Sequence, residues 1–142
     1  MKHIAGGLVV LLLLVGLAGC NTLARRPQLK NATLAPSELK PGESAVLSVE
    51  VRDRHDVVRK VEGAVREDPS IKFKLHDDGQ MPDRKPGDHT WSLQVDVPFQ
   101  APAGNYTFDL TAYRSDGTPV PVRAHGKTAP LTATLPVIIK TP

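Results

Sequence analysis

The strongest constraint on the fold is an alternation of apolar and polar residues, which returns in short runs along most of the chain. It is clearest at residues 45–51, 91–97 and 106–112, where apolar side chains occupy every second position. This period of two is typical of strands with one buried face. Weaker runs lie at 29–34, 57–65, 71–75 and 131–139. Because turn residues separate these runs and no helical period follows Cys20, the pattern predicts an all-β fold, an antiparallel β-sandwich of about seven strands.

Few large side chains are available to fill the centre of such a sandwich. The aromatic residues expected on inward faces are Phe73, Trp91, Tyr106 and Phe108. If Trp91 lies in the core, its replacement by alanine should cost several kcal/mol, about 3–5 for a fully buried ring. In the last run, prolines at 130 and 136 fall on the face opposite the apolar residues. Proline cannot donate a ladder hydrogen bond, so this strand is expected at a sheet edge or at a bulge.

The N-terminus has a different character. Lys2 precedes an uncharged run at 4–17 of apolar residues and glycines, which is short for a membrane span. A charged start, a short apolar stretch and small residues at its end are the layout of a secretory signal peptide. Leu17-Ala18-Gly19-Cys20 resembles the lipobox of bacterial lipoproteins. The resemblance implies a signal peptide at 1–19, a lipidated tether at 20–28 and one domain at 29–142, with acyl chains on Cys20 that hold the protein on a membrane.

The charge and the cysteine content limit which classes of partner and which cellular compartment are expected. Without Lys2 the remaining 17 basic residues are set against 15 acidic ones, a net charge of +2. No run of five like charges occurs, which argues against nucleic acid as a partner. Acylation would consume the single thiol. Asn21 is not the aspartate that retains enteric lipoproteins in the inner membrane, so we expect the bacterial cell envelope, with the outer membrane, facing the periplasm or the surface, favoured over the inner membrane.

Three segments in the second half resemble bacterial immunoglobulin-like domains. They read LHDDG at 75–79, GDHTW at 87–91 and PAGNYTF at 102–108. The resemblance implies an immunoglobulin-like sandwich with Tyr106 near the start of the penultimate strand, where a tyrosine corner would lie. Such modules serve as spacers, adhesive units or binding platforms, and the fold does not decide among these roles.

The 77–88 segment is the candidate metal site, with two glycines among its acidic residues. Its four carboxylates are Asp77, Asp78, Asp83 and Asp88. Carboxylate oxygens suit Ca²⁺, although the spacing differs from an EF-hand and no glutamate closes the loop. Arg84 and Lys85 add positive charge. The alternative is that these residues serve turn geometry, because aspartate side chains bond to the nearby backbone.

Few other residues suggest a catalytic or binding site. The scattered histidines offer only His76 and His89 as a pair flanking one loop, and no G-x-S-x-G setting or acid–base pair is evident. Phe99 and Tyr113 are the aromatics expected to be exposed, too few for a sugar-stacking platform. We therefore predict a non-enzymatic, membrane-anchored envelope lipoprotein without cofactor. Its domain would be a protein-interaction or structural module for another envelope protein, with a Ca²⁺- or glycan-binding accessory domain as the alternative.

Overall fold

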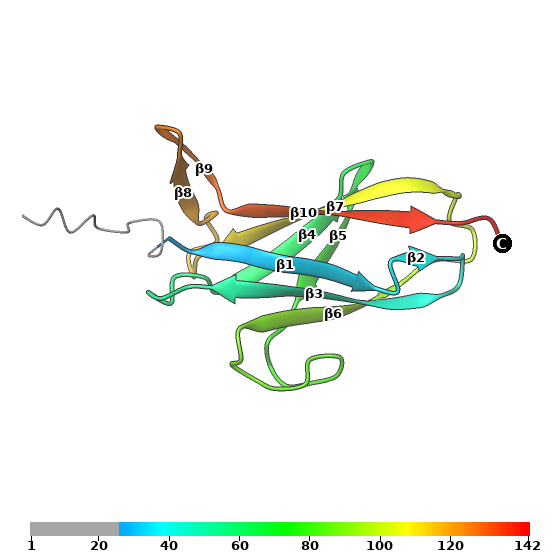
Figure 1. The fold of residues 1–142 in the computed structure, drawn as a ribbon, viewed down its shortest axis with the longest axis horizontal. Helices are drawn as coiled ribbons and strands as arrows, with labels where there is room; N and C mark the ends of the chain where they lie inside the picture. The colour runs from blue at the N-terminus through cyan, green and yellow to red at the C-terminus, as the bar shows by residue number, and fades with distance from the viewer. Residues whose placement is uncertain (1–25) are drawn as a thin grey trace, which may run out of the picture.

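The computed structural model describes residues 26–142, so the predicted signal peptide, Cys20 and most of the predicted tether lie outside the described part. Figure 1 shows two layers of strands. The first sheet consists of β1 (Gln28–Ala35), β3 (Ser44–Arg52) and β6 (Thr90–Asp96), in that order. The second has the order β2 (Glu38–Leu39), β10 (Thr132–Ile139), β7 (Gly104–Tyr113), β4 (Lys60–Val65) and β5 (Asp68–Leu75). A separate hairpin consists of β8 (Pro121–Ala124) and β9 (Lys127–Pro130).

The strand order is that of an immunoglobulin-like sandwich. Apart from β2 and the β8–β9 hairpin, seven strands remain, and the first, second and fifth of them form one sheet. The seventh, sixth, third and fourth form the other, with antiparallel pairing throughout. Only the two-residue β2 pairs in parallel, with β10. The predicted fold class is therefore confirmed, and each run of alternating residues corresponds to a strand.

The sequence pattern at 120–122 was misleading. Val120 and Val122 suggest a strand that pairs back along 106–112, and the turn at 115–117 is present. In the structure only one bridge forms, between Tyr113 and Pro119, and β8 then pairs with β9. The reason is that Val120 lies between two prolines. Its N–H donates to the carbonyl oxygen of Ala112 (2.9 Å), but neither proline can extend the ladder.

The core is aliphatic rather than aromatic, which corrects the prediction for three of the four expected core residues. Phe108 is buried, whereas Trp91, Tyr106 and Phe73 are only half-buried and pack against the core from its margin. Trp91 and Phe73 lie on β6 and β5, each the outermost strand of its sheet, and Tyr106 lies near the start of β7. The centre is filled by side chains with no exposed surface: Leu47, Val49, Val61, Leu75, Leu110 and Ala112.

Gly63 has a packing function, although in the sequence it looks like an interruption of a strand. It pairs with Phe73 across β4 and β5. A Cβ atom at Gly63 would lie 2.2 Å from Cε2 of Phe73 and 2.9 Å from Cδ2 of Leu110. The Phe73 ring therefore covers the bare glycine backbone, and it packs on Phe108 with 5.0 Å between ring centroids and 58° between ring planes. Such cross-strand aromatic contacts stabilise sheets.

The last strand, β10, lies almost at an edge. It pairs with β7 along its whole length, but with β2 only at Ile138 and Ile139. Pro136 precedes the two residues that pair with β2. Its missing N–H therefore removes no hydrogen bond between β10 and β2. The predicted edge position is therefore not confirmed: β10 lies one strand in from the edge, and Pro130 belongs to β9 instead.

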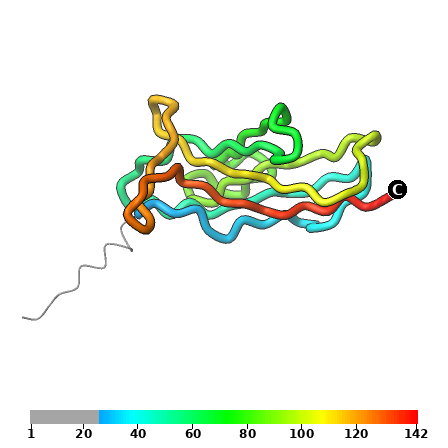
Figure 2. The backbone as a smooth tube through the Cα atoms, turned by 90° about the horizontal axis from the view of Figure 1, so that it is seen from above, coloured from blue at the N-terminus to red at the C-terminus, as the bar shows by residue number. Residues whose placement is uncertain are grey.

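The two ends of the sandwich differ. The described chain enters at one end, beside the β8–β9 hairpin, and the C-terminus lies at the other (Figures 1 and 2). Between these ends, the outermost strands β5 and β6 border the same side of the sandwich. Just after β5, the N–H groups and carbonyls of His76 and Ser92 exchange hydrogen bonds of 2.8 and 2.9 Å, which close this side over part of its length.

Candidate functional site

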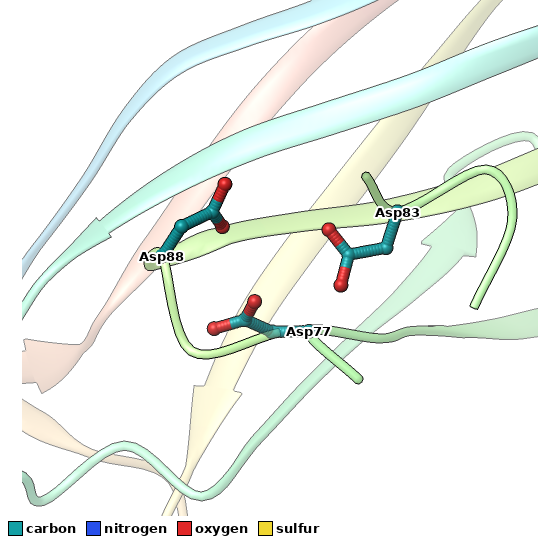
Figure 3. A group of neighbouring side chains, drawn as sticks. All are labelled: Asp77, Asp83 and Asp88. Atoms are coloured by element: carbon teal, nitrogen blue, oxygen red, sulfur yellow. The ribbon is translucent and has the colours of Figure 1, made fainter. Parts of the chain in front are cut away.

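Three carboxylates converge in the segment that joins β5 to β6. Asp77 follows the end of β5, Asp83 lies in the middle of the segment, and Asp88 precedes β6. Each offers an oxygen, and these oxygens lie within 4.8 Å of one another. Figure 3 shows the carboxyl groups gathered around a shared space. The loop thus brings together three of the four residues predicted as cation ligands.

The surroundings of these carboxylates are partly closed to water. Asp83 is only 2% exposed, and its Oδ2 accepts a hydrogen bond from the N–H of Gly79 (2.6 Å). Asp77 is half-buried, and its Oδ2 accepts from the N–H of His89 (3.2 Å). The other oxygen, Oδ1 of Asp77, is buried and has no hydrogen-bond partner. Within residues 26–142, no lysine or arginine forms an ion pair with any of the three carboxylates.

The electrostatic consequence is clearest at Asp77. Burial raises the pKa of its carboxyl above the ordinary value, and the negative charges of Asp83 and Asp88 raise it further. The hydrogen bond from the His89 N–H acts in the opposite direction. Three carboxylate groups lie within reach of one cation, and Oδ1 of Asp77 has no hydrogen-bond partner. A hard cation such as Ca²⁺ would neutralise the negative charge of this cluster. Ca²⁺ prefers six to eight oxygen ligands, so water or carbonyl groups would have to complete its shell.

Asp78 does not belong to this group, which corrects the predicted ligand set. Its Oδ1 accepts a hydrogen bond from the N–H of Gln80 (3.0 Å), as in an Asx turn. Asp88 bonds the N–H of Thr90 in the same way (2.9 Å). The turn-forming role considered as the alternative is therefore confirmed for these side chains, and for Asp88 it coexists with membership of the cluster.

The predicted tyrosine corner is confirmed. Tyr106 is the third residue of β7, and its hydroxyl donates to the carbonyl oxygen of Pro102 at 2.8 Å. This bond fixes the approach of the chain to β7. Of the two aromatics expected to be exposed, Phe99 is 85% exposed. Tyr113 is half-buried rather than exposed, and the Lys60 ammonium lies over its ring, 5.1 Å from the centroid.

A second candidate site was not predicted from the sequence. It is an apolar pocket of about 370 Å³ between the sheets, at the end remote from Arg26. It extends from Ile71, which is 52% exposed, to Leu39, which is 1% exposed. The intervening lining is almost entirely apolar: Val65, Phe73, Val95, Val97, Pro98, Ala101, Pro102, Tyr106, Phe108, Val137 and Ile139. Asp96 and Gln100 are its polar members.

The one signal in the sequence was Ile71 itself, which alternates with Phe73 and Leu75 as if all three were equally covered. In the structure Leu75 is fully buried and Phe73 half-buried, while Ile71 is exposed. The cover of the apolar residues on β5 thus decreases from Leu75 to Ile71, which lies at the exposed margin of the pocket.

Comparison with known proteins yields a likeness of fold alone. No protein-family model matches the chain, and no curated protein matches it. A solved structure that matches is an endo-β-1,4-mannanase from Thermotoga petrophila, with 12% identity and a TM-score of 0.53. The match covers 83% of this chain but only 20% of the mannanase. The chain thus spans a fifth of that enzyme's length, and at this identity the match supports the all-β sandwich and nothing further.

Two other structures match more weakly. A Niemann-Pick type C2 protein from the Japanese carpenter ant has 12% identity and a TM-score of 0.46, with 80% of this chain and 92% of that chain covered. The soluble domain of PmoD from Methylocystis sp. also has 12% identity, with a TM-score of 0.39 and coverage of 81% and 90%. The part of the chain that the structure describes contains no helix capable of crossing a bilayer.

Proposed function

We propose that this chain is a lipid-anchored protein of the bacterial envelope whose sandwich is a non-catalytic binding module. The anchor would be acyl chains on Cys20, as the lipobox resemblance implies. The observation that supports the proposal is that the two ends of the sandwich differ. Arg26, six residues after Cys20, precedes β1 at one end of the sandwich, whereas β2 and the end of β10, which line the apolar pocket, lie at the other. An anchored module of this shape would present that far end to a partner.

The surface at the far end is the kind that partners cover. Ile71, which lines the apolar pocket, is 52% exposed, and nearby Phe99 is 85% exposed. A well-formed apolar pocket with few polar groups is the usual place for a ligand or partner to bind. We expect the partner to be another envelope protein. The edge of β5 is a less favourable place for strand pairing, because exposed Lys72 and Lys74 flank Phe73 there.

The anchor can be tested by metabolic labelling with an alkyne analogue of palmitate, followed by mass analysis of the mature N-terminus. The expected result is label on the wild-type chain and none on Cys20→Ser, with the labelled protein in the outer-membrane fraction. An unlabelled mature N-terminus would exclude the anchor.

The presented end can be tested by photo-crosslinking in cells. A photoreactive amino acid in place of Phe99 should yield a discrete crosslinked partner. The same amino acid in place of Met81, which is 88% exposed but lies in the 77–88 loop, is the matched control and should yield none. Equal crosslinking from both positions would contradict the proposal.

A second candidate function is Ca²⁺ binding by Asp77, Asp83 and Asp88. The observation in its favour is the buried, unpaired Oδ1 of Asp77 beside two other carboxylates. A cation bound only by the native state raises stability, by about 2.7 kcal/mol at one hundred times its Kd. Thermal unfolding with Ca²⁺ or with EDTA tests this, and an unchanged Tm at millimolar Ca²⁺ would remove the candidate.

A further inference from the structure

We propose that the apolar pocket at the far end of the sandwich binds a single unbranched acyl chain whose headgroup is uncharged or zwitterionic. This inference rests on the proposed function, because it assigns a ligand class to the end that the anchored module would present. The pocket's size of about 370 Å³ is within the range of small-molecule sites, about 300–1,000 Å³. Its continuity from exposed Ile71 to buried Leu39 gives a ligand a path from solvent into the core.

The polarity of the lining favours an acyl chain over a peptide. The Tyr106 hydroxyl donates to the Pro102 carbonyl, and Oδ1 of Asp96 accepts hydrogen bonds from Ser44 (2.5 Å) and Gln94 (2.9 Å). Gln100, which is exposed, is the remaining polar side chain of the lining. A peptide segment inside the pocket would leave backbone N–H and C=O groups without partners, at a large desolvation cost. An acyl chain has no such groups, and water in an apolar cavity is poorly hydrogen-bonded.

The charge of the lining selects the headgroup. Asp96 is its single ionisable acid or base apart from the Tyr106 phenol, and no lysine, arginine or histidine belongs to it. Hydrogen bonds from Ser44 and Gln94 lower the pKa of Asp96, so its carboxylate is charged at neutral pH. A headgroup with a net negative charge at this rim would meet the like charge of Asp96, with no cation in the lining to compensate it. Uncharged and zwitterionic headgroups avoid this repulsion.

The acyl chains proposed for Cys20 are not the occupant. Six residue steps separate Cys20 from Arg26, which lets the chain span about 20 Å at most. The ten residues of β7 alone extend about 33 Å along the sandwich, and the pocket is at the far end of that strand. Acyl chains that stay in the bilayer as the anchor cannot also fill the pocket, so the ligand comes from another molecule.

The experiment uses a chain that begins at Asn21, which retains every buried core residue, since these run from Leu34 to Val137. The uncharged fluorophore N-phenyl-1-naphthylamine is bound first and then displaced by monoacylglycerols of different chain length, below their micellar concentrations. While the added methylenes still enter the pocket, each should strengthen displacement about fourfold, the transfer of one CH₂ from water. Monolauroylglycerol and lauroyl-lysophosphatidylcholine should displace the probe at lower concentrations than laurate.

The variants test the location. Ala101→Phe fills the pocket and should weaken probe binding at least about tenfold, the expected cost of losing two methylenes of contact. Ala103→Phe, two residues away on the exposed surface, is the matched control and should bind as wild type does. If Ala101→Phe loses its β-sheet circular dichroism, Ile71→Gln at the pocket mouth replaces it, with Ile138→Gln as control.

Three results would overturn the assignment: no probe binding by the wild-type chain, displacement that does not depend on chain length, or equal binding by pocket and control variants. Displacement by laurate in preference to the monoacylglycerol would overturn the headgroup assignment. None of these results concerns acylation of Cys20, so failure of the pocket assignment and failure of the anchor are separately visible.

Discussion

At the scale of single residues, Gly63 shows how the absence of a side chain can be structural. We expect Gly63→Ala to lower the free energy of unfolding by about 1–3 kcal/mol, because the added methyl group must displace the Phe73 ring. Urea unfolding monitored by circular dichroism measures this loss. In the background of Phe73→Leu, which removes the ring, the same change should cost less. An unchanged urea midpoint for Gly63→Ala alone would mean that the ring is not held over the glycine.

The burial of Asp77 beside two other carboxylates should make the stability of the protein depend on pH. Because its folded-state pKa is raised, its contribution to stability is fully present below the unfolded-state pKa, about 4, and is lost as the pH rises through the folded value. In EDTA, Asp77→Asn should therefore gain Tm relative to wild type as the pH rises through this window, and Ca²⁺ should no longer shift its Tm.

The control is Asp78→Asn, which removes one negative charge from the same loop outside the cluster. Thermal unfolding of the three proteins between pH 3 and 7 makes the comparison. A Tm difference between wild type and Asp77→Asn that stays constant across this range would contradict the crowding.

At the scale of elements, the β8–β9 hairpin is an appendage of the sandwich. Val120 and Leu131, at its base, are 1% and 6% exposed, and the Leu131 N–H donates to the Val120 carbonyl at 2.7 Å. The hairpin between them is largely exposed. Replacing residues 121–130 by a short glycine–serine linker should therefore change the free energy of unfolding by less than about 1 kcal/mol. Denaturant unfolding of the shortened chain measures this, and loss of cooperative unfolding would show that the hairpin supports the core.

Elements with a regular alternation could be predicted because one face of each strand is buried. This holds for β3 and β7, whose buried positions follow the sequence pattern. On β6 the apolar positions are only half-buried, and the buried residue is Ser92. The strand after Gly117 could not be placed, since the choice between pairing with β7 and forming a new hairpin depended on two prolines and on where the chain goes next. Three of the four expected core aromatics, Phe73, Trp91 and Tyr106, lie at the margin of the core for a similar reason. The size of Trp91 gives no sign that β6 is the outermost strand of its sheet.

At the scale of the whole molecule, both candidate sites depend on long-range geometry. The sequence identified the acidic residues of the 77–88 loop, but not that Asp78 turns to its own backbone while the other three converge. The apolar pocket depends on how far β5 extends beyond the cover of the opposite sheet. That offset is set by the pairing of all the strands and leaves no local pattern beyond Ile71.

Arg26 and the pocket lie at opposite ends of the sandwich, which bears on the route by which an acyl ligand could reach the pocket. With a lipid on Cys20 and a leash of about 20 Å, the body of the domain rests near the bilayer. If the sandwich stands with its strands pointing away from the membrane, its length of about 30 Å separates the pocket mouth from the lipid headgroups. In that orientation acyl cargo could not enter the pocket directly from the supporting leaflet. It would have to be delivered from the aqueous side, by a carrier or by a second membrane facing the first.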